Sequence, residues 1–215
     1  MLKLVFYSDQ ILPSGKKVDE GMLDLLGKKN PNVGYIPSSS DPERKWYIDR
    51  KKYYSQYGIN LGFYFGLDQA YDPKNLDMLL SCDAIHLPGG NTYHFLQRLK
   101  NRNLLEPLRK YATDGGILIG VSAGAILMTT DISTTFLCGE KPVQGRSDNS
   151  GLGLVDFAFV PHFGRFNAGL PEIRNYSQQQ HTTVYGCPDG AGILVNGDQI
   201  DLIGQVVTVI NGVIA

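Results

Sequence analysis

The feature that most constrains this chain is the segment 120–124, which reads Gly-Val-Ser-Ala-Gly and follows the apolar run 116–119. Helix-forming residues come directly after it, so we expect a strand, a sharp turn and a helix in that order. Glycines stand on both sides of the serine because larger side chains would collide at such a turn. The pattern predicts that Ser122 lies on a strained turn with its hydroxyl exposed. Two interpretations stay open here: a nucleophile, or a glycine-rich turn with a capping serine.

Length and charge exclude several classes of protein. With 215 residues the chain is long enough to bury a sizeable core, and we predict a single domain over residues 1–215. The formal net charge is −1, from 20 basic and 21 acidic residues, which argues against nucleic acid and anionic membranes as partners. The N-terminus becomes polar too early for a signal peptide, and no apolar run approaches the roughly 20 residues of a membrane span. We therefore expect a cytoplasmic protein.

The cysteines give no sign of a disulfide or a zinc site. Cys82, Cys138 and Cys187 are odd in number and far apart, and none belongs to a Cys-x-x-Cys pair. This usage suits a reducing compartment. We expect no metal and no cofactor.

The order of apolar segments predicts a mostly parallel sheet with helices on both faces. Strands are expected at 2–7, 33–36, 63–65, 84–87 and 116–119. Helices are expected at 14–26, 42–57, 76–80, 93–99 and 104–112. Beyond residue 132 the pattern changes to short β-rich segments, at 155–160, 191–195, 199–202 and 206–210. Asn-Gly pairs at 196–197 and 211–212 are typical of hairpin turns, so we expect antiparallel strands that complete the same sheet.

Ligands of such sheets bind beyond the carboxyl ends of the strands, and three segments fall there. They are the turn at Ser122, the Pro-Gly-Gly-Asn run at 88–91 and the Val-Pro-His-Phe run at 160–163. Glycine amides at a helix start can approach an oxyanion, although the glycine pair could also be a plain tight turn. A serine hydroxyl needs a base, and His162 stands at a strand end after the serine.

The other histidines have structural explanations. His86 lies inside an expected strand, and His94 lies on an amphipathic helix. His181 belongs to a polar run that is typical of a solvated helix end. His162 is therefore the candidate base.

Three separated blocks of this sequence occur together in a known family. They are Gly-x-Ser-Ala-Gly-Ala at 120–125, Pro-Gly-Gly-Asn-Thr at 88–92 and Pro-His-Phe at 161–163. With the later segments 167–172 and 188–191, the chain resembles the dipeptidase E (aspartyl dipeptidase) and cyanophycinase family of serine peptidases over residues 33–204. The resemblance implies a flavodoxin-like three-layer sandwich, similar to class I glutamine amidotransferases. Those enzymes carry a cysteine where Ser122 stands, which argues against glutaminase chemistry.

The resemblance also implies roles for individual residues. Ser122 would be the nucleophile, and His162 the general base and later the acid. The amides of Gly90 and Ala123 would form the oxyanion hole. Asn91 would contact the substrate.

The carboxylate behind the histidine is implied less directly. Dipeptidase E-like sequences carry an aspartate after the serine, at the position where this chain has Leu137. Cyanophycinase-like sequences place a glutamate slightly later, after a glycine, and Glu140 matches this arrangement. Glu140 is therefore the first candidate for the carboxylate, and Asp131 is the second. Family dipeptidases hold an N-terminal aspartate with an arginine downstream of the histidine. Arg174 is the nearest such residue here, and Arg165 is the second.

These observations together predict a serine-type exopeptidase that hydrolyses short peptides, among them dipeptides with an N-terminal aspartate. A small peptide is the expected partner, and the protein would be a monomer or a homodimer. Two alternatives stay open. One is an esterase of the α/β-hydrolase type, which usually carries its histidine nearer the C-terminus. The other is a binding or sensing protein of the same fold that has lost turnover.

Overall fold

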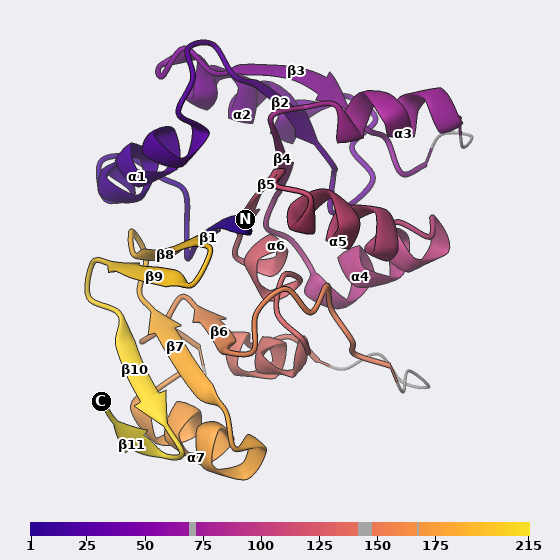
Figure 1. Cartoon of the computed structure of the whole chain (residues 1–215). Coiled ribbons are helices and arrows are strands. Elements are labelled where there is room, and N and C mark those ends of the chain that lie inside the picture. The colour runs from indigo at the N-terminus through magenta and orange to yellow at the C-terminus, as the bar shows by residue number, and fades with distance from the viewer. Residues whose placement is uncertain (69–71, 142–147, 167) are drawn as a thin grey trace.

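The computed structural model describes residues 1–68, 72–141, 148–166 and 168–215. Asn167, the first residue of one of the family-like segments, lies outside the described residues. Within the described ranges, a seven-stranded sheet runs through the middle of the molecule in the order β3-β2-β4-β5-β1-β8-β9 (Figure 1). Its strands are β1 (Lys3–Tyr7), β2 (Asn32–Tyr35), β3 (Asn60–Tyr64), β4 (Ala84–Leu87), β5 (Ile117–Val121), β8 (Gly192–Asn196) and β9 (Gln199–Ile203).

The sheet is parallel from β3 to β1 and antiparallel at its other edge. Neighbouring strands pair in parallel across β3, β2, β4, β5 and β1. The hairpin β8–β9 continues the sheet beside β1 in antiparallel register. The prediction of a mostly parallel, flavodoxin-like sheet with antiparallel C-terminal strands is thereby confirmed.

Helices cover both faces of this sheet (Figure 1). They are α1 (Lys16–Leu26), α2 (Lys45–Ser55), α3 (Pro73–Leu80), α4 (Thr92–Asn101), α5 (Leu105–Thr113) and α6 (Ala123–Ile126). Successive residues of a strand point to opposite faces, so each strand contributes to two cores. On β1, Leu4 and Phe6 pack with the side chains of α3 to α6, whereas Val5 and Tyr7 pack with those of α1 and α2.

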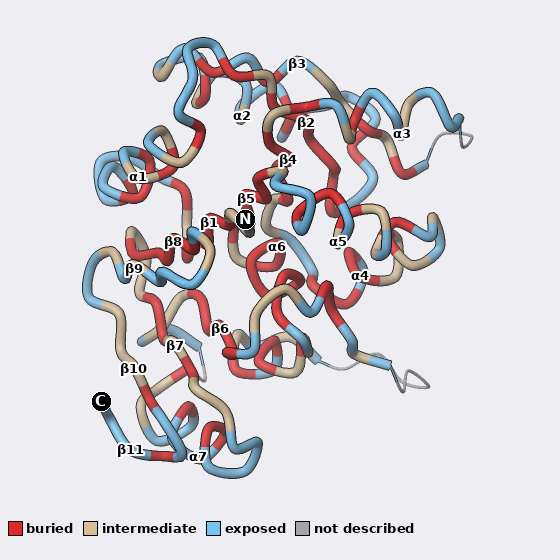
Figure 2. The backbone as a smooth tube through the Cα atoms, in the orientation of Figure 1, coloured by how far each residue is buried: buried red, intermediate tan, exposed pale blue. Residues whose placement is uncertain are grey.

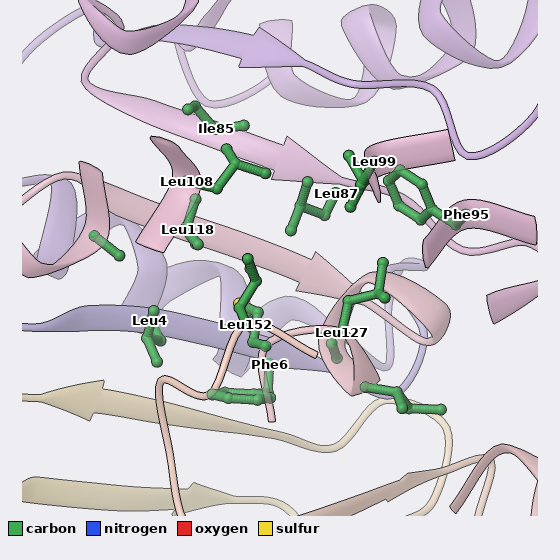
Figure 3. Packing of buried hydrophobic residues seen from close by; sticks show 14 of the residues in the cluster. Leu4, Phe6, Ile85, Leu87, Phe95, Leu99, Leu108, Leu118, Leu127 and Leu152 are labelled. Atoms are coloured by element: carbon green, nitrogen blue, oxygen red, sulfur yellow. The ribbon is translucent and has the colours of Figure 1, made fainter. Parts of the chain in front are cut away.

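Both cores are closely filled. Figure 3 shows part of the first, where Leu4, Leu118 and Leu87 meet Leu108 and Phe95 from the helices. Figure 2 shows the buried backbone of β1, β4 and β5 in the middle of the molecule. Because the central strands are buried on both sides, their positions are held by packing from two layers. The carboxyl ends of these strands are therefore a rigid platform for side chains.

The C-terminal third departs from the prediction of one sheet. In the described part of the chain, β6, β7, β10 and β11 form a separate four-stranded sheet in the order β11-β10-β7-β6. Their bounds are β6 (Ala158–Pro161), β7 (Thr183–Cys187), β10 (Val207–Ile210) and β11 (Val213–Ile214). Helix α7 (Leu170–Gln180) packs on this sheet. The 3₁₀-helix η1 (Ser133–Cys138) comes before β6 in the chain. Strand β7 was not among the predicted segments. The residue pattern also could not tell which sheet a short strand joins, because strand pairing depends on contacts between distant segments.

The face under α1 and α2 also contains buried polar groups. Asp19 is fully buried and accepts hydrogen bonds from the hydroxyls of Tyr7, Tyr53 and Tyr57 at 2.8, 2.6 and 2.8 Å. These donors replace the water that the carboxylate loses on burial. The carboxylate thus ties β1 and α1 to α2, which lies beside the cavity described below.

His86 gives the fold a testable dependence on pH. It is fully buried on β4, with Nδ1 2.9 Å from the Tyr54 hydroxyl, and burial together with the Arg50 charge holds its pKa well below the usual value. The folded protein keeps this imidazole neutral, whereas the unfolded chain takes up a proton below about pH 6.5. The free energy of unfolding should therefore fall as the pH is lowered through this value, by up to about 1.4 kcal/mol per pH unit from this residue.

Urea denaturation between neutral pH and about pH 5 measures this effect. His86→Gln should show a weaker pH dependence than the unmodified protein. His94→Gln, which changes an exposed histidine, should keep the original slope. Equal slopes for all three proteins would contradict this account of His86.

Candidate active site

Ser122 lies on the predicted sharp turn between β5 and α6, with φ 49° and ψ −109°. Its amide donates to the Tyr7 carbonyl at 2.9 Å, and its carbonyl accepts the amides of Ala125 and Ile126 at 3.0 Å each. A Cβ at Gly120 would lie 2.7 Å from the backbone of Ala125, and one at Gly124 would lie 1.9 Å from the carbonyl oxygen of Leu87. The two glycines are required because the turn packs backbone against backbone. A strained conformation in a buried setting is typical of a functional residue.

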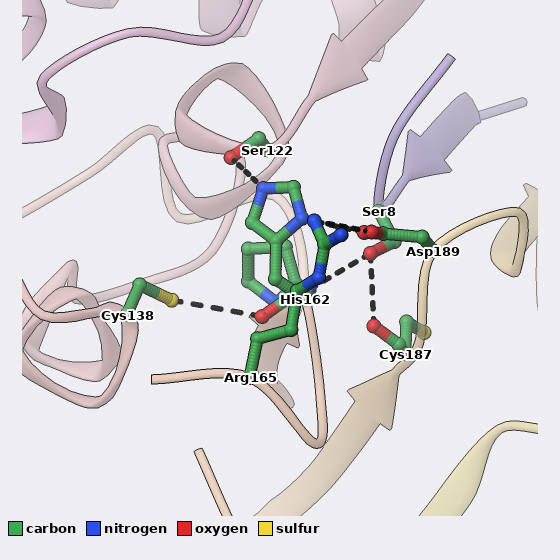
Figure 4. Close-up of polar contacts among 8 residues, drawn as sticks. Ser8, Ser122, Cys138, His162, Arg165, Cys187 and Asp189 are labelled. Carbon is green, nitrogen blue, oxygen red and sulfur yellow. Dashed lines mark hydrogen bonds and ion pairs between the residues drawn. The ribbon is translucent and has the colours of Figure 1, made fainter. Parts of the chain in front are cut away.

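His162 follows β6 and approaches Ser122 from the second sheet (Figure 4). Its Nε2 lies 3.0 Å from the Ser122 hydroxyl. Its backbone is in the left-handed region, with φ 55°, and its amide donates to the hydroxyl of Ser8 at 2.8 Å. Ser8 is fully buried at the end of β1 and itself donates to the Cys187 carbonyl at 2.9 Å. The structure therefore brings together the two residues that the sequence predicted as nucleophile and base.

The carboxylate behind His162 is that of Asp189, not of Glu140. Asp189 Oδ1 lies 2.6 Å from His162 Nδ1, and Asp189 Oδ2 lies 2.7 Å from Nη1 of Arg165 (Figure 4). About a fifth of each of the His162 and Asp189 side chains is exposed (20% and 22%). The Asp189 carboxylate thus contacts the imidazole on one side and a guanidinium on the other.

Glu140 and Asp131 have other partners. Glu140 accepts from the amide and the hydroxyl of Thr92 at 2.9 and 2.8 Å, at the first residue of α4. Burial raises the pKa of this carboxyl. Asp131 accepts from the Ser133 amide at 2.6 Å, at the start of η1. The structure therefore does not place Glu140 beside His162: this carboxylate accepts hydrogen bonds at a helix N-terminus, where carboxylates are stabilised.

Asp189 was not among the residues predicted from the sequence. The family patterns place the carboxylate between Ser122 and His162, whereas Asp189 lies after His162, in the Pro-Asp-Gly-Ala segment between β7 and β8. The pattern that identifies Ser122 and His162, a polar residue just beyond the carboxyl end of a strand, also applies to Asp189. Asp189 stands beyond the carboxyl end of a strand, but that strand, β7, was not predicted.

The glycine loop lies beside the serine. A Cβ at Gly89 would lie 3.6 Å from the Cβ of Ser122. Gly90 has φ +144°, and the preceding carbonyl, of Gly89, accepts a hydrogen bond from the Ser38 hydroxyl at 2.7 Å. Asn91 uses its side-chain oxygen to accept the His94 amide at 2.9 Å, which caps α4. The loop is thus held at both ends next to Ser122.

A cavity of about 680 Å³ opens over these groups and is lined by Ser122, His162, Gly89 and Gly90. Arg174, expected to hold a substrate carboxylate, lies elsewhere. Its Nε donates to the Gly212 carbonyl at 2.8 Å, and it lines a different hollow with Leu170. The second candidate, Arg165, is paired with Asp189 instead.

The described residues hold no cluster of three or more His, Cys, Asp or Glu side chains that could bind a metal ion. Among the described helices, none has the length and apolar character that crossing a bilayer requires.

Comparison with known proteins decides the family. The sequence model of peptidase family S51 matches residues 9–203. The chain belongs to peptidase family S51. As a member of that family it is a serine peptidase, and the resemblance seen in its sequence blocks is confirmed. This membership argues against the esterase alternative.

Relatives of this S51 peptidase carry consistent names. Peptidase E of Salmonella typhi is 28% identical, over 94% of this chain and 90% of that protein. Peptidase E of a Nostoc strain is 24% identical, over 85% and 76%. The probable alpha-aspartyl dipeptidase of Drosophila melanogaster is 30% identical, over 62% of this chain and 58% of that protein.

Solved structures agree with the fold. A peptidase E protein of Listeria monocytogenes superposes with a TM-score of 0.70 at 23% identity, over 94% of this chain and 98% of that one. A peptidase from an acI-B1 actinobacterium gives a TM-score of 0.73 at 17% identity, over 98% and 91%. At these identities the likeness establishes the fold of the S51 peptidase.

The turn at Ser122 leads to a prediction about stability. Gly124→Ala places a methyl group on the Leu87 carbonyl, so the free energy of unfolding should fall by about 1–3 kcal/mol or more. Gly89→Ala is the matched control, because its Cβ would make an ordinary contact with Ser122. Chemical denaturation of both variants is the measurement. If Gly124→Ala were as stable as Gly89→Ala, the crowding argument for the turn would be wrong.

Proposed function

We propose that this S51 peptidase hydrolyses short peptides through a triad of Ser122, His162 and Asp189. The observation that carries the proposal is the continuous hydrogen-bonded path from the Ser122 hydroxyl through both nitrogens of His162 to Asp189. Such a path supplies a nucleophile, a base and a group that orients the base. It opens into a cavity large enough for a small peptide.

In the first half of the reaction the Ser122 oxygen attacks the peptide carbonyl, and His162 Nε2 takes the hydroxyl proton. The tetrahedral intermediate then collapses, and His162 returns that proton to the leaving amine. Water then attacks the acyl-enzyme, and His162 Nε2 takes a proton from it. When this second intermediate collapses, His162 returns the proton to the Ser122 oxygen and the carboxylic acid product is released. Throughout, Asp189 accepts a hydrogen bond from the Nδ1–H of His162, which leaves Nε2 free to act as the base and stabilises the imidazolium once it forms.

The amides of Gly90 and Ala123 are our candidates for holding the oxyanion. Ala123 is the first residue of α6, where amides have no acceptor within the helix. A carbonyl and the next amide point in opposite directions across a trans peptide, so the bond from Ser38 to the Gly89 carbonyl also orients the Gly90 N–H. Amides fixed before the reaction cost no reorganisation when the charge develops.

Dipeptides with an N-terminal aspartate are the substrates we propose. The support is the family, whose members include proteins named peptidase E and alpha-aspartyl dipeptidase. The cavity is lined by the basic residue Arg50 and by acidic residues, among them Asp9 and Asp41, and charges of both signs suit a zwitterionic dipeptide. The monomer or homodimer expected from the sequence stays a prediction.

Replacing the nucleophile gives the first test. Ser122→Ala should lower kcat for hydrolysis of Asp-Leu by about 10⁴–10⁶-fold. It should also abolish labelling by a fluorophosphonate, and leave the circular dichroism spectrum unchanged. Full activity in the purified variant would refute the assignment of Ser122. Absence of labelling in the unmodified protein, together with no hydrolysis, would favour the alternative of a protein that binds without turnover.

The choice between the two carboxylates can be tested directly. Asp189→Asn should lower kcat by about 10³–10⁴-fold with little change in KM, because an amide can donate to Nδ1 and favour the wrong tautomer. Glu140→Gln is the matched control, and its kcat should stay within about tenfold of the original, since Glu140 contacts Thr92 and not His162. The reverse ranking of the two variants would restore Glu140 as the third residue.

A further inference from the structure

The cavity at Ser122 has an arginine in its wall. Arg50 of α2 is half-buried and lines the cavity together with Ser122 and His162. Its Nη1 donates to the backbone carbonyl of Gln10 at 3.1 Å and to the Gln10 side-chain oxygen at 2.8 Å. Its guanidinium also lies over the ring of Tyr53, 4.8 Å from the centroid. Gln10 is itself almost fully buried, so the guanidinium is held in one place.

The charge of Arg50 has no counterion in the described part of the chain. No described carboxylate oxygen lies within 4.0 Å of its guanidinium, and its two hydrogen bonds both go to neutral oxygens. A guanidinium has five N–H donors, and these two bonds use Nη1 alone. The Nε and Nη2 donors therefore remain without an acceptor among the described residues. These two form the edge that binds a carboxylate through two parallel hydrogen bonds.

Three aspartates line the cavity with Arg50, and two of them have other partners. Asp41 lines the cavity, but its carboxylate accepts the amides of Lys45 and Trp46 at 2.9 and 3.1 Å, where it caps the start of α2. Asp49 is exposed and lies 3.8 Å from Lys52. Asp9 lines the cavity as well. Carboxylates near an arginine that they do not pair with suit a ligand carrying both an ammonium and a carboxylate.

We propose that Arg50 binds a carboxylate of the peptide substrate through its Nε–Nη2 edge, and that it favours acidic dipeptides if this carboxylate is the side chain of the N-terminal aspartate. The proposal rests on the function proposed above in one respect, that the substrate occupies the cavity at Ser122. Two carboxylates of an aspartyl dipeptide could reach Arg50: the side chain of the N-terminal aspartate, or the C-terminal carboxylate. If the aspartate side chain is bound, Arg50 has the role that the family resemblance implied for Arg174, from a different element of the fold.

The test measures binding, so that it does not depend on turnover. Calorimetry on the Ser122→Ala protein compares Asp-Leu, Asn-Leu and Asp-Leu amide, with and without Arg50→Gln. Loss of a charged pair of hydrogen bonds should raise the Kd of Asp-Leu by about 10- to 150-fold. If the aspartate side chain is bound, the Kd of Asn-Leu should be the same in both proteins. If the C-terminal carboxylate is bound, the Kd of Asp-Leu amide should be the same instead.

Two further variants make the result specific. Lys51→Gln removes the same charge from an exposed neighbour on α2 and should leave all three Kd values unchanged. Arg50→Lys keeps the charge without the two-donor edge and should give an intermediate Kd for Asp-Leu. If Arg50→Gln does not fold, Arg50→Lys takes its place in the comparison. The proposal is overturned if Arg50→Gln weakens all three ligands by one factor, if it changes none, or if the Ser122→Ala parent binds none of them. A parent that binds Asp-Leu through Arg50, while the unmodified protein hydrolyses no peptide, would refute the triad and support Arg50.

Discussion

The position of His162 over Ser122 depends on the hydroxyl of Ser8. This fully buried group at the end of β1 accepts the His162 amide and donates to the Cys187 carbonyl. One hydroxyl thereby connects the central sheet to the ends of β6 and β7 in the second sheet. Ser122 follows β5 of the central sheet, whereas His162 and Asp189 follow β6 and β7 of the second sheet. Phe159 of β6 also packs on Phe6 of β1, so hydrogen bonds and apolar packing together hold the His162 imidazole beside the Ser122 hydroxyl.

The strained backbone conformations at Ser122 and His162 are also maintained by contacts from other parts of the fold. Ser122 and His162 both adopt positive φ without being glycine. The Ser122 amide donates to the Tyr7 carbonyl, and the His162 amide donates to the Ser8 hydroxyl. Such conformations cost of order 1–3 kcal/mol each and persist only where the surroundings determine them. The double layer of helices and the buried central strands provide that determination. The fold thus holds two unfavourable conformations close together, and the hydroxyl and the imidazole meet between them.

Much of the central sheet could be predicted from the sequence. The strands near 84–87 and 116–121 are continuous apolar runs, and glycine motifs mark where they end, so both their identity and their carboxyl ends were found within a few residues. Ser122 and His162 could be found because each stands directly beyond such an end. The contacts of Arg174 and Glu140 could not be predicted, since their roles were implied by a resemblance to family sequences, and a helix or loop can turn either residue toward a different neighbour.

The sequence by itself determined the sharp turn at Ser122, since glycines on both sides are needed where backbone packs on backbone, and it determined the family through blocks that keep their order. Only the tertiary structure decided that the C-terminal strands divide between two sheets, and that Asp189 rather than Glu140 lies behind His162. The physical reason is that strand pairing and the partner of a carboxylate depend on contacts between distant segments. A local residue pattern does not specify which distant segment a strand or a side chain will contact in the folded protein.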